Sequence, residues 1–237
     1  MELTENTSDS SDGGEDAVTT PSSATTVSRE DVAGIVEGRH RDPFSVLGPH
    51  SARSAAGPAL AIRAFVPGAR EGWVVEAGQT HALTLVDKSG FFEVVLPGRE
   101  GIGKYRLRFR SSEGLIFEVD DAYAFPTVLS DYDLYLLGEG THYKNYQLLG
   151  AHLREIDGVA GVSFAVWAPN AQRVSVVGDF NFWDGRRHPM RFHPGVGVWD
   201  IFVPGLKEGD VYKFELLGPE SQLLPLKSDP YGFYFEL

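Results

Sequence analysis

The 237 residues suit one large or two ordinary domains, and a hydrophobic content of 42% provides enough apolar side chains for a core. The net charge of −12 would repel a phosphate backbone, so nucleic acid is not an expected partner. The sequence contains no cysteine, which excludes disulfides, thiolate metal sites and a cysteine nucleophile. It also has no apolar run of ~20 residues, so no membrane span is expected and a cytoplasmic protein is favoured.

Residues 1–27 are predicted to form a disordered acidic tail. They are nearly all Ser, Thr, Gly, Ala, Asp and Glu, with no aromatic residue, and cannot bury enough apolar surface to become ordered. Residues 1–30 hold seven acidic residues and one basic residue, which is half of the net charge. A docking tail is the alternative, but we favour a solvated extension without a specific partner.

Residues 28–126 are predicted to form a first β-sandwich module. A short helix opens it, because Ser28 precedes Asp31 by three residues and the apolar Val32 and Ile35 follow. Short β-branched and aromatic runs, separated by Pro-Gly and Ser-Gly turns, then predict strands. These strands are expected at 60–66, 73–76, 81–86, 91–96, 105–110 and 115–119.

Residues 127–150 are predicted to form a short helical linker. Leu134 and Leu137 have helical spacing, and Gly138 and Gly140 interrupt the helix. Strands return at 162–167, 173–177, 198–203 and 211–217, so residues 151–237 are predicted to form a second β-sandwich module.

The two predicted modules are copies of one another. Leu47-Gly48-Pro49-His50 returns as Leu149-Gly150-Ala151-His152, and residues 65–69 return as 167–171, both at an offset of 102. Residues 90–98 match 197–205 at an offset of 107, and residues 121–125 match 229–233 at 108. The second copy has therefore gained about five residues, at the loop of residues 178–185. The expected fold is mainly β, with two tandem immunoglobulin-like β-sandwich modules.

No motif in the sequence points to catalysis. There is no nucleophile elbow, phosphate loop, zinc-protease motif or dinucleotide fingerprint. The spacings of His40 and Asp42, and of His188 and His193, arise often by chance, so no metal or other cofactor is expected. Glycosidic acid/base chemistry needs two carboxylates that face each other across a cleft, and nothing in the sequence indicates such a pair.

The loop of residues 178–185 carries a candidate sugar-binding site. Trp183 could stack on a glucose ring, Asn181 could serve two adjacent hydroxyls, and Lys213 could donate to a third. Packing of Trp183 against a neighbouring domain is the equal alternative. At least one of Phe180 and Phe182 is expected in the core.

Trp167 and Trp199 lie within strand patterns, so both are expected to be core residues rather than ligand contacts.

Several motifs resemble a known family. Phe164-Ala165-Val166-Trp167-Ala168-Pro169-Asn170-Ala171, the 178–185 loop, Gly197-Val198-Trp199, Tyr212-Lys213-Phe214 and Asp229-Pro230-Tyr231 resemble the carbohydrate-binding module of α-amylase-superfamily enzymes that act on glycogen and starch. With Asp42-Pro43-Phe44-Ser45-Val46-Leu47-Gly48-Pro49-His50 and the Gly140-Thr141-His142 segment, residues 30–237 resemble the paired amino-terminal domains of bacterial glycogen branching enzyme (1,4-α-glucan branching enzyme).

The resemblance implies that the parent transfers an α-1,4-glucan chain to a 6-hydroxyl, with two carboxylates on a (β/α)₈ barrel. That barrel would begin after residue 233, so we expect this chain to be a truncated form without activity of its own. Its modules would position the missing barrel in cis and contact α-glucan such as glycogen or maltooligosaccharide. The first module, which lacks the loop, is expected to be structural.

Related glycogen-binding modules usually carry a second aromatic platform where this chain has residues 222–226, Gln-Leu-Leu-Pro-Leu, so weak affinity is expected. The alternative functions are a free-standing glycogen-binding or regulatory module, and the amino-terminal part of a debranching or trehalose-releasing hydrolase.

Overall fold

The computed structural model describes residues 25–235, and its architecture is mainly β, as predicted. Most of the predicted tail, residues 1–24, lies outside the described residues. Its last residues differ from the prediction, because the backbone N–H of Thr26 donates a 3.1 Å hydrogen bond to Glu93 and Arg63 donates a 2.6 Å bond to the Thr26 hydroxyl. The first module therefore already includes Thr26.

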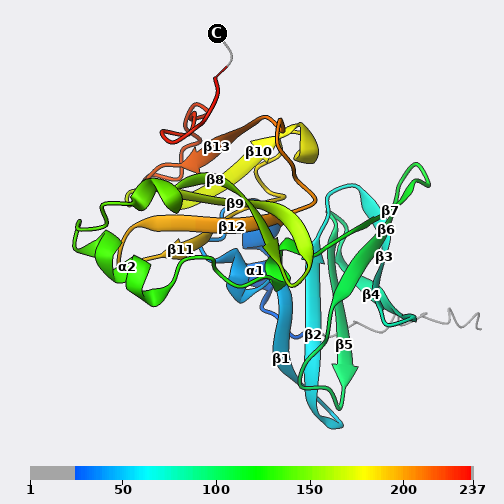
Figure 1. Ribbon diagram of the computed structural model, residues 1–237. Helices are drawn as coiled ribbons and strands as arrows, with labels where there is room; N and C mark the ends of the chain where they lie inside the picture. Colours follow the sequence, from blue (N-terminus) through cyan, green and yellow to red (C-terminus); the bar gives the residue numbers. More distant parts are fainter. Residues whose placement is uncertain (1–24, 236–237) are drawn as a thin grey trace, which may run out of the picture.

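The first module is one antiparallel sheet that folds over its own core (Figure 1). The strand order is β1-β2-β5-β4-β3-β6-β7. Ile62 and Phe92 on β2 and β5 pack in one cluster with Val74 and Phe109 on β3 and β6. The elements are α1 (Arg29–Val36), η1 (Pro43–Ser45), β1 (Gly48–Ser54), β2 (Gly57–Phe65), β3 (Ala69–Glu76), β4 (Gln79–Asp87), β5 (Phe91–Pro97), β6 (Tyr105–Ser111) and β7 (Ile116–Val119).

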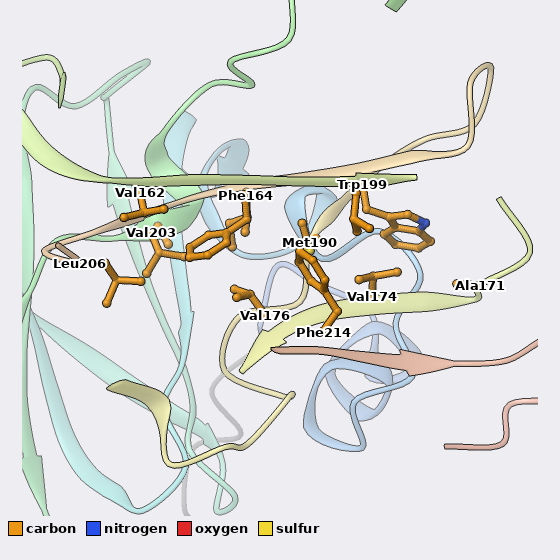
Figure 2. Close-up of a cluster of buried hydrophobic side chains, with 13 residues drawn as sticks. Val162, Phe164, Ala171, Val174, Val176, Met190, Trp199, Val203, Leu206 and Phe214 are labelled. Carbon is orange, nitrogen blue, oxygen red and sulfur yellow. The ribbon is translucent and has the colours of Figure 1, made fainter. Parts of the chain in front are cut away.

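The second module is a sandwich of two sheets, with strand orders β11-β12-β9-β8 and β10-β13. Figure 2 shows Phe164 and Trp199 on one side of its core, facing Val176 and Phe214. The first module ends with η2 (Ala122–Ala124). The elements of the second module are α2 (Asp131–Gly138), η3 (Asn145–Gln147), β8 (Gly150–Ile156), β9 (Val159–Trp167), β10 (Arg173–Gly178), η4 (Asp179–Asn181), β11 (Arg191–His193), β12 (Val198–Pro204) and β13 (Tyr212–Leu217). None of the helices within residues 25–235 has the length and apolar character needed to cross a membrane.

The segment predicted as a helical linker repeats the start of the first module. Helix α2 begins 102 residues after α1, and η3 begins 102 residues after η1. Ser28 and Ser130 are the N-caps of the two helices, and each accepts a 3.1 Å bond from the N–H of an aspartate three residues later. Residues 127–150 therefore join the two sandwiches and also supply the opening helix of the second copy.

The inserted loop replaces a tight turn. In the first module the turn between β3 and β4 contains only Ala77 and Gly78, and β4 then crosses from β3 to β5. In the second module the chain leaves β10 at Gly178 and returns to the sheet at His188, whose carbonyl accepts a bond from Val176. Residues 188–193 then take the path of β4, pairing with β10 and afterwards with β12.

Arginine side chains of the second module contact the first module. The Arg187 guanidinium donates a 2.9 Å hydrogen bond to the carbonyl of Pro67, and Arg191 lies 3.8 Å over the ring of Phe44. These contacts set the end of the inserted loop and β11 against the first module.

Candidate functional site

The predicted sugar-binding loop has an unusual backbone. Phe182 and Trp183 both adopt left-handed conformations, with φ of +59° and +58°, which few residues other than glycine accept. At the base of the loop Gly178 has no room for a side chain, because a Cβ would lie 2.3 Å from the carbonyl oxygen of Val211. The Trp183 N–H donates a 2.9 Å hydrogen bond to the carbonyl of Gly178 and closes the turn.

This backbone presents two aromatic side chains at the surface. Phe182 is 78% exposed and Trp183 is 37% exposed. The indole Nε1 of Trp183 donates a 2.8 Å hydrogen bond to Asp179, which fixes the orientation of the ring. An exposed aromatic plane held by one edge is suited to stack on the C–H face of a sugar.

Asn181 does not have the role predicted for it. Only 1% of the residue is exposed, and its amide is directed into the loop. The side-chain oxygen accepts a 2.9 Å bond from the N–H of Gly178, and Nδ2 donates a 2.9 Å bond to the carbonyl of Val176. Because these groups already satisfy the amide, Asn181 holds the loop in shape and does not reach sugar hydroxyls.

His188 completes this buried network. Its Nδ1 lies 2.9 Å from the Nδ2 of Asn181, and it can accept a hydrogen bond only while the ring is neutral. Burial and the neighbouring Arg187 lower the pKa of His188 to about 4. The loop is therefore built on a histidine that stays neutral at pH 7.

Arg187 joins the loop to the first module. Its guanidinium carbon lies 5.2 Å from the centre of the Phe182 ring, while the same side chain binds the Pro67 carbonyl. From the other module, the Tyr123 hydroxyl lies 3.3 Å from the carbonyl of Pro189 and donates to it. The first module thus supports one side of the loop, a contact that the sequence did not reveal.

Lys213 is exposed on β13, opposite Val177 in the β10–β13 pair. It lines a cavity of about 930 Å³ with Phe180, Val211 and Tyr212. Trp183 and Asn181 are not among the residues that line this cavity. The structure therefore places Lys213 beside the base of the loop but does not bring the three predicted site residues into one pocket.

The aromatic side chains divide differently from the prediction. Phe180 packs partly against the core, as expected for one of the two phenylalanines, and Trp199 is fully buried. The prediction for Trp167 is wrong, because its side chain is 64% exposed at the end of β9. In strand alternation Trp167 shares its face with Ala165, outside the core cluster that contains Phe164, and it is the last residue of the strand.

The acidic side chains of the loop have structural partners. Within residues 25–235, no group of three or more His, Cys, Asp or Glu side chains is placed to hold a metal ion. The carboxylate of Asp184 is paired with Arg186 through bonds of 2.9 and 2.8 Å. Although burial raises the pKa of Asp184, these bonds outweigh burial and lower it, so the group is a charged structural partner.

Two family descriptions match the chain. Residues 28–123 match "alpha-1,4-glucan branching enzyme GlgB, N-terminal domain", and residues 148–232 match "Carbohydrate-binding module 48 (Isoamylase N-terminal domain)". The two matches follow the two copies of the repeat.

Curated relatives agree with this assignment. The chain is 56% identical over 209 residues to the 1,4-alpha-glucan branching enzyme GlgB of Cereibacter sphaeroides, covering 87% of this chain and 28% of the relative. It is 49% identical over 217 residues to the enzyme of that name from Paramagnetospirillum magneticum, covering 92% of this chain and 28% of the relative. The chain thus spans about 28% of the length of these relatives.

Among solved structures, a pullulanase from Anoxybacillus sp. is 16% identical, with a TM-score of 0.26 over 68% of this chain and 23% of the pullulanase.

Proposed function

We propose, from the premise that this chain belongs to the amino-terminal region of the 1,4-alpha-glucan branching enzyme family, that its second module holds an α-glucan chain for a parent enzyme of that activity. The parent would transfer an α-1,4-glucan chain to a 6-hydroxyl and so form α-1,6 branches. The two modules themselves would be non-catalytic, and the first would help to position the catalytic barrel in cis.

The observation that carries this proposal is the presentation of Trp183. Its ring is exposed, its indole N–H is tied to Asp179, and its backbone is held in a left-handed conformation by the loop. Each strained residue destabilises the fold by on the order of 1–3 kcal/mol, so such conformations are found mainly where a rigid geometry is needed. Phe182 beside it and Lys213 on β13 would add an apolar contact and a donor.

We prefer a branching-enzyme parent over a free-standing module and over a debranching or trehalose-releasing parent. A free-standing glycogen-binding module would not require the duplicated first module, and the match of residues 28–123 is specifically to a branching-enzyme domain. A debranching or trehalose-releasing parent is supported only by the second module, whose matching description names the isoamylase N-terminal domain.

Titration with maltoheptaose tests the glucan site. We expect the parent chain to bind weakly and Trp183→Ala to lose about fivefold in affinity, the factor that ~1 kcal/mol of aromatic stacking supplies. Tyr132→Ala is the matched control, because Tyr132 is an exposed aromatic residue on α2, away from the loop. Equal affinity of the parent and Trp183→Ala would remove the loop from the site.

The non-catalytic role has its own test. Incubation of this chain with amylose is expected to leave the iodine stain unchanged and to form no new α-1,6 linkages. Turnover by the chain alone would contradict this role without affecting the binding result.

A further inference from the structure

A second aromatic surface lies at the other end of the second module. Trp167 is the last residue of β9, and its side chain is 64% exposed. The indole Nε1 donates a 3.1 Å hydrogen bond to the carbonyl of Val196, so the ring is held by one edge, as Trp183 is held by Asp179. No other aromatic ring within residues 25–235 stacks on it.

Trp167 borders a hollow of about 710 Å³ between the end of α2 and the β11–β12 turn. The apolar side chains of Leu137 and Val196 line this hollow, together with the polar side chains of Glu139 and Asn145. Neither of these polar side chains makes a hydrogen bond or ion pair with another residue of the described chain. A carboxylate and an amide are the groups that accept from and donate to sugar hydroxyls.

At the corresponding position of the first module, the side chains are buried. Phe65 is the counterpart of Trp167 at the 102-residue offset, and it is only 7% exposed. Val32 and Ile35 of α1 are buried in the same cluster as Phe65. In the second module their counterparts are Leu134 and Leu137, and α2 has no fully buried residue. The second copy has therefore opened a site that the first copy fills with its own core.

We infer that Trp167 and this hollow form a second binding site for an α-1,4-glucan chain, separate from the Trp183 loop. The inference rests on the proposed function, because it takes α-glucan as the ligand of the module. Trp167 would stack on one glucose ring, and Glu139 and Asn145 would contact the hydroxyls of that ring or the next. The hollow lies within the size range of small-ligand sites.

The two sites cannot be one. Trp167 ends β9, whereas Gly178 ends β10, and the six residues of β10 span roughly 20 Å along the sandwich. In Figure 1, α2 lies at the end of the second sandwich far from the first module, while β10 leads to the opposite end. Two weak sites on one rigid module would hold a long glucan polymer more tightly than either site alone.

The four tryptophans provide a direct readout. In ¹H–¹⁵N NMR spectra of the whole chain, each indole N–H gives one signal, which substitution to phenylalanine assigns. On addition of maltoheptaose we expect the Trp167 and Trp183 signals to shift, and those of Trp73 and the fully buried Trp199 to stay in place. Cellohexaose, which has β-1,4 links, is the control ligand and should shift Trp167 less.

Variants separate the two sites. In Trp183→Ala the Trp167 signal should still shift with its affinity unchanged, and in Asn145→Ala the affinity read at Trp167 alone should fall about fivefold. A Trp167 signal that stays in place while Trp183 shifts would overturn the second site but leave the proposed function intact. A Trp167 shift that disappears in Trp183→Ala would also overturn it. If neither signal moves, the proposed function fails as well.

Discussion

The hydroxyl of Tyr212 donates a 2.6 Å hydrogen bond to the buried carboxylate of Asp229. In the first module the hydroxyl of Tyr105 makes the same bond, also at 2.6 Å, to Asp121. Each carboxylate also accepts a bond from the N–H two residues further along the chain. The same pair thus fastens the last long strand of each sandwich to the segment that leaves it.

Removal of either tyrosine hydroxyl should therefore destabilise its module. We expect Tyr105→Phe and Tyr212→Phe each to reduce the free energy of unfolding by about 1–3 kcal/mol, because a buried carboxylate loses a donor. Urea unfolding measures this effect. Tyr234→Phe is the control, since that side chain is exposed and should leave stability unchanged. Equal stability of all three variants would contradict a structural role for the pair.

The strands of both sandwiches could be predicted because apolar residues recur at every second position on their inner faces. Phe164 and Val166 belong to one core cluster, while Ala165 between them packs in another, and Ile62 and Ala64 of β2 follow the same two-residue period. The strands β1 and β8 were not predicted, since both are polar edge strands in which backbone pairing supplies the only regular signal.

The site was harder to predict, because its residues depend on long-range contacts. Asn181 has the residue type of a sugar ligand, and only the path of β10 and the position of His188 show that its amide is used internally. Arg187 carries no sequence signal of a site, yet it links the loop to Pro67, 120 residues away.

The pKa of His188 predicts how stability changes with pH. Burial and Arg187 lower this pKa from 6.5 to about 4 in the folded chain, so the unfolded chain takes up the proton first as the pH falls. The contribution of His188 to stability is complete above about pH 6.5 and is lost progressively down to about pH 4.

Asp121 acts with the opposite sign. Burial raises its pKa from 3.8 to about 6, although bonds from Tyr105 and Tyr123 oppose this shift, so its contribution falls as the pH rises between those values. The effect of His188 is therefore isolated by comparison with His188→Asn, which keeps an acceptor for Asn181. The stability of the parent relative to this variant should rise from pH 4 to pH 6.5, and a flat difference would contradict a buried neutral histidine.

Substitution of Asn181 should reduce stability, whereas substitution of Lys213 should reduce only glucan binding. Asn181→Ala leaves the N–H of Gly178 and the carbonyl of Val176 without partners, and should cost about 1–3 kcal/mol of stability. Lys213 is exposed, so Lys213→Ala should leave stability unchanged and weaken maltoheptaose binding only. Thermal unfolding and ligand titration of both variants check this. A stable Asn181→Ala that has lost only binding would restore the direct sugar contact first predicted for Asn181.

Arg187 connects the proposed sugar-binding loop to the first module, and its replacement should affect binding more than stability. Burial lowers the pKa of Arg187, and its Nε has no partner within residues 25–235, so removal of the side chain also relieves a buried charge. The loop nevertheless loses the contact that holds Phe182 and reaches Pro67. We expect Arg187→Ala to weaken maltoheptaose binding about three- to fivefold, and Arg187→Lys to restore little, because an ammonium group cannot make the planar contact. Arg70→Ala, at an exposed position in the first module, is the control. Unchanged affinity in Arg187→Ala would show that the second module shapes its loop without the first.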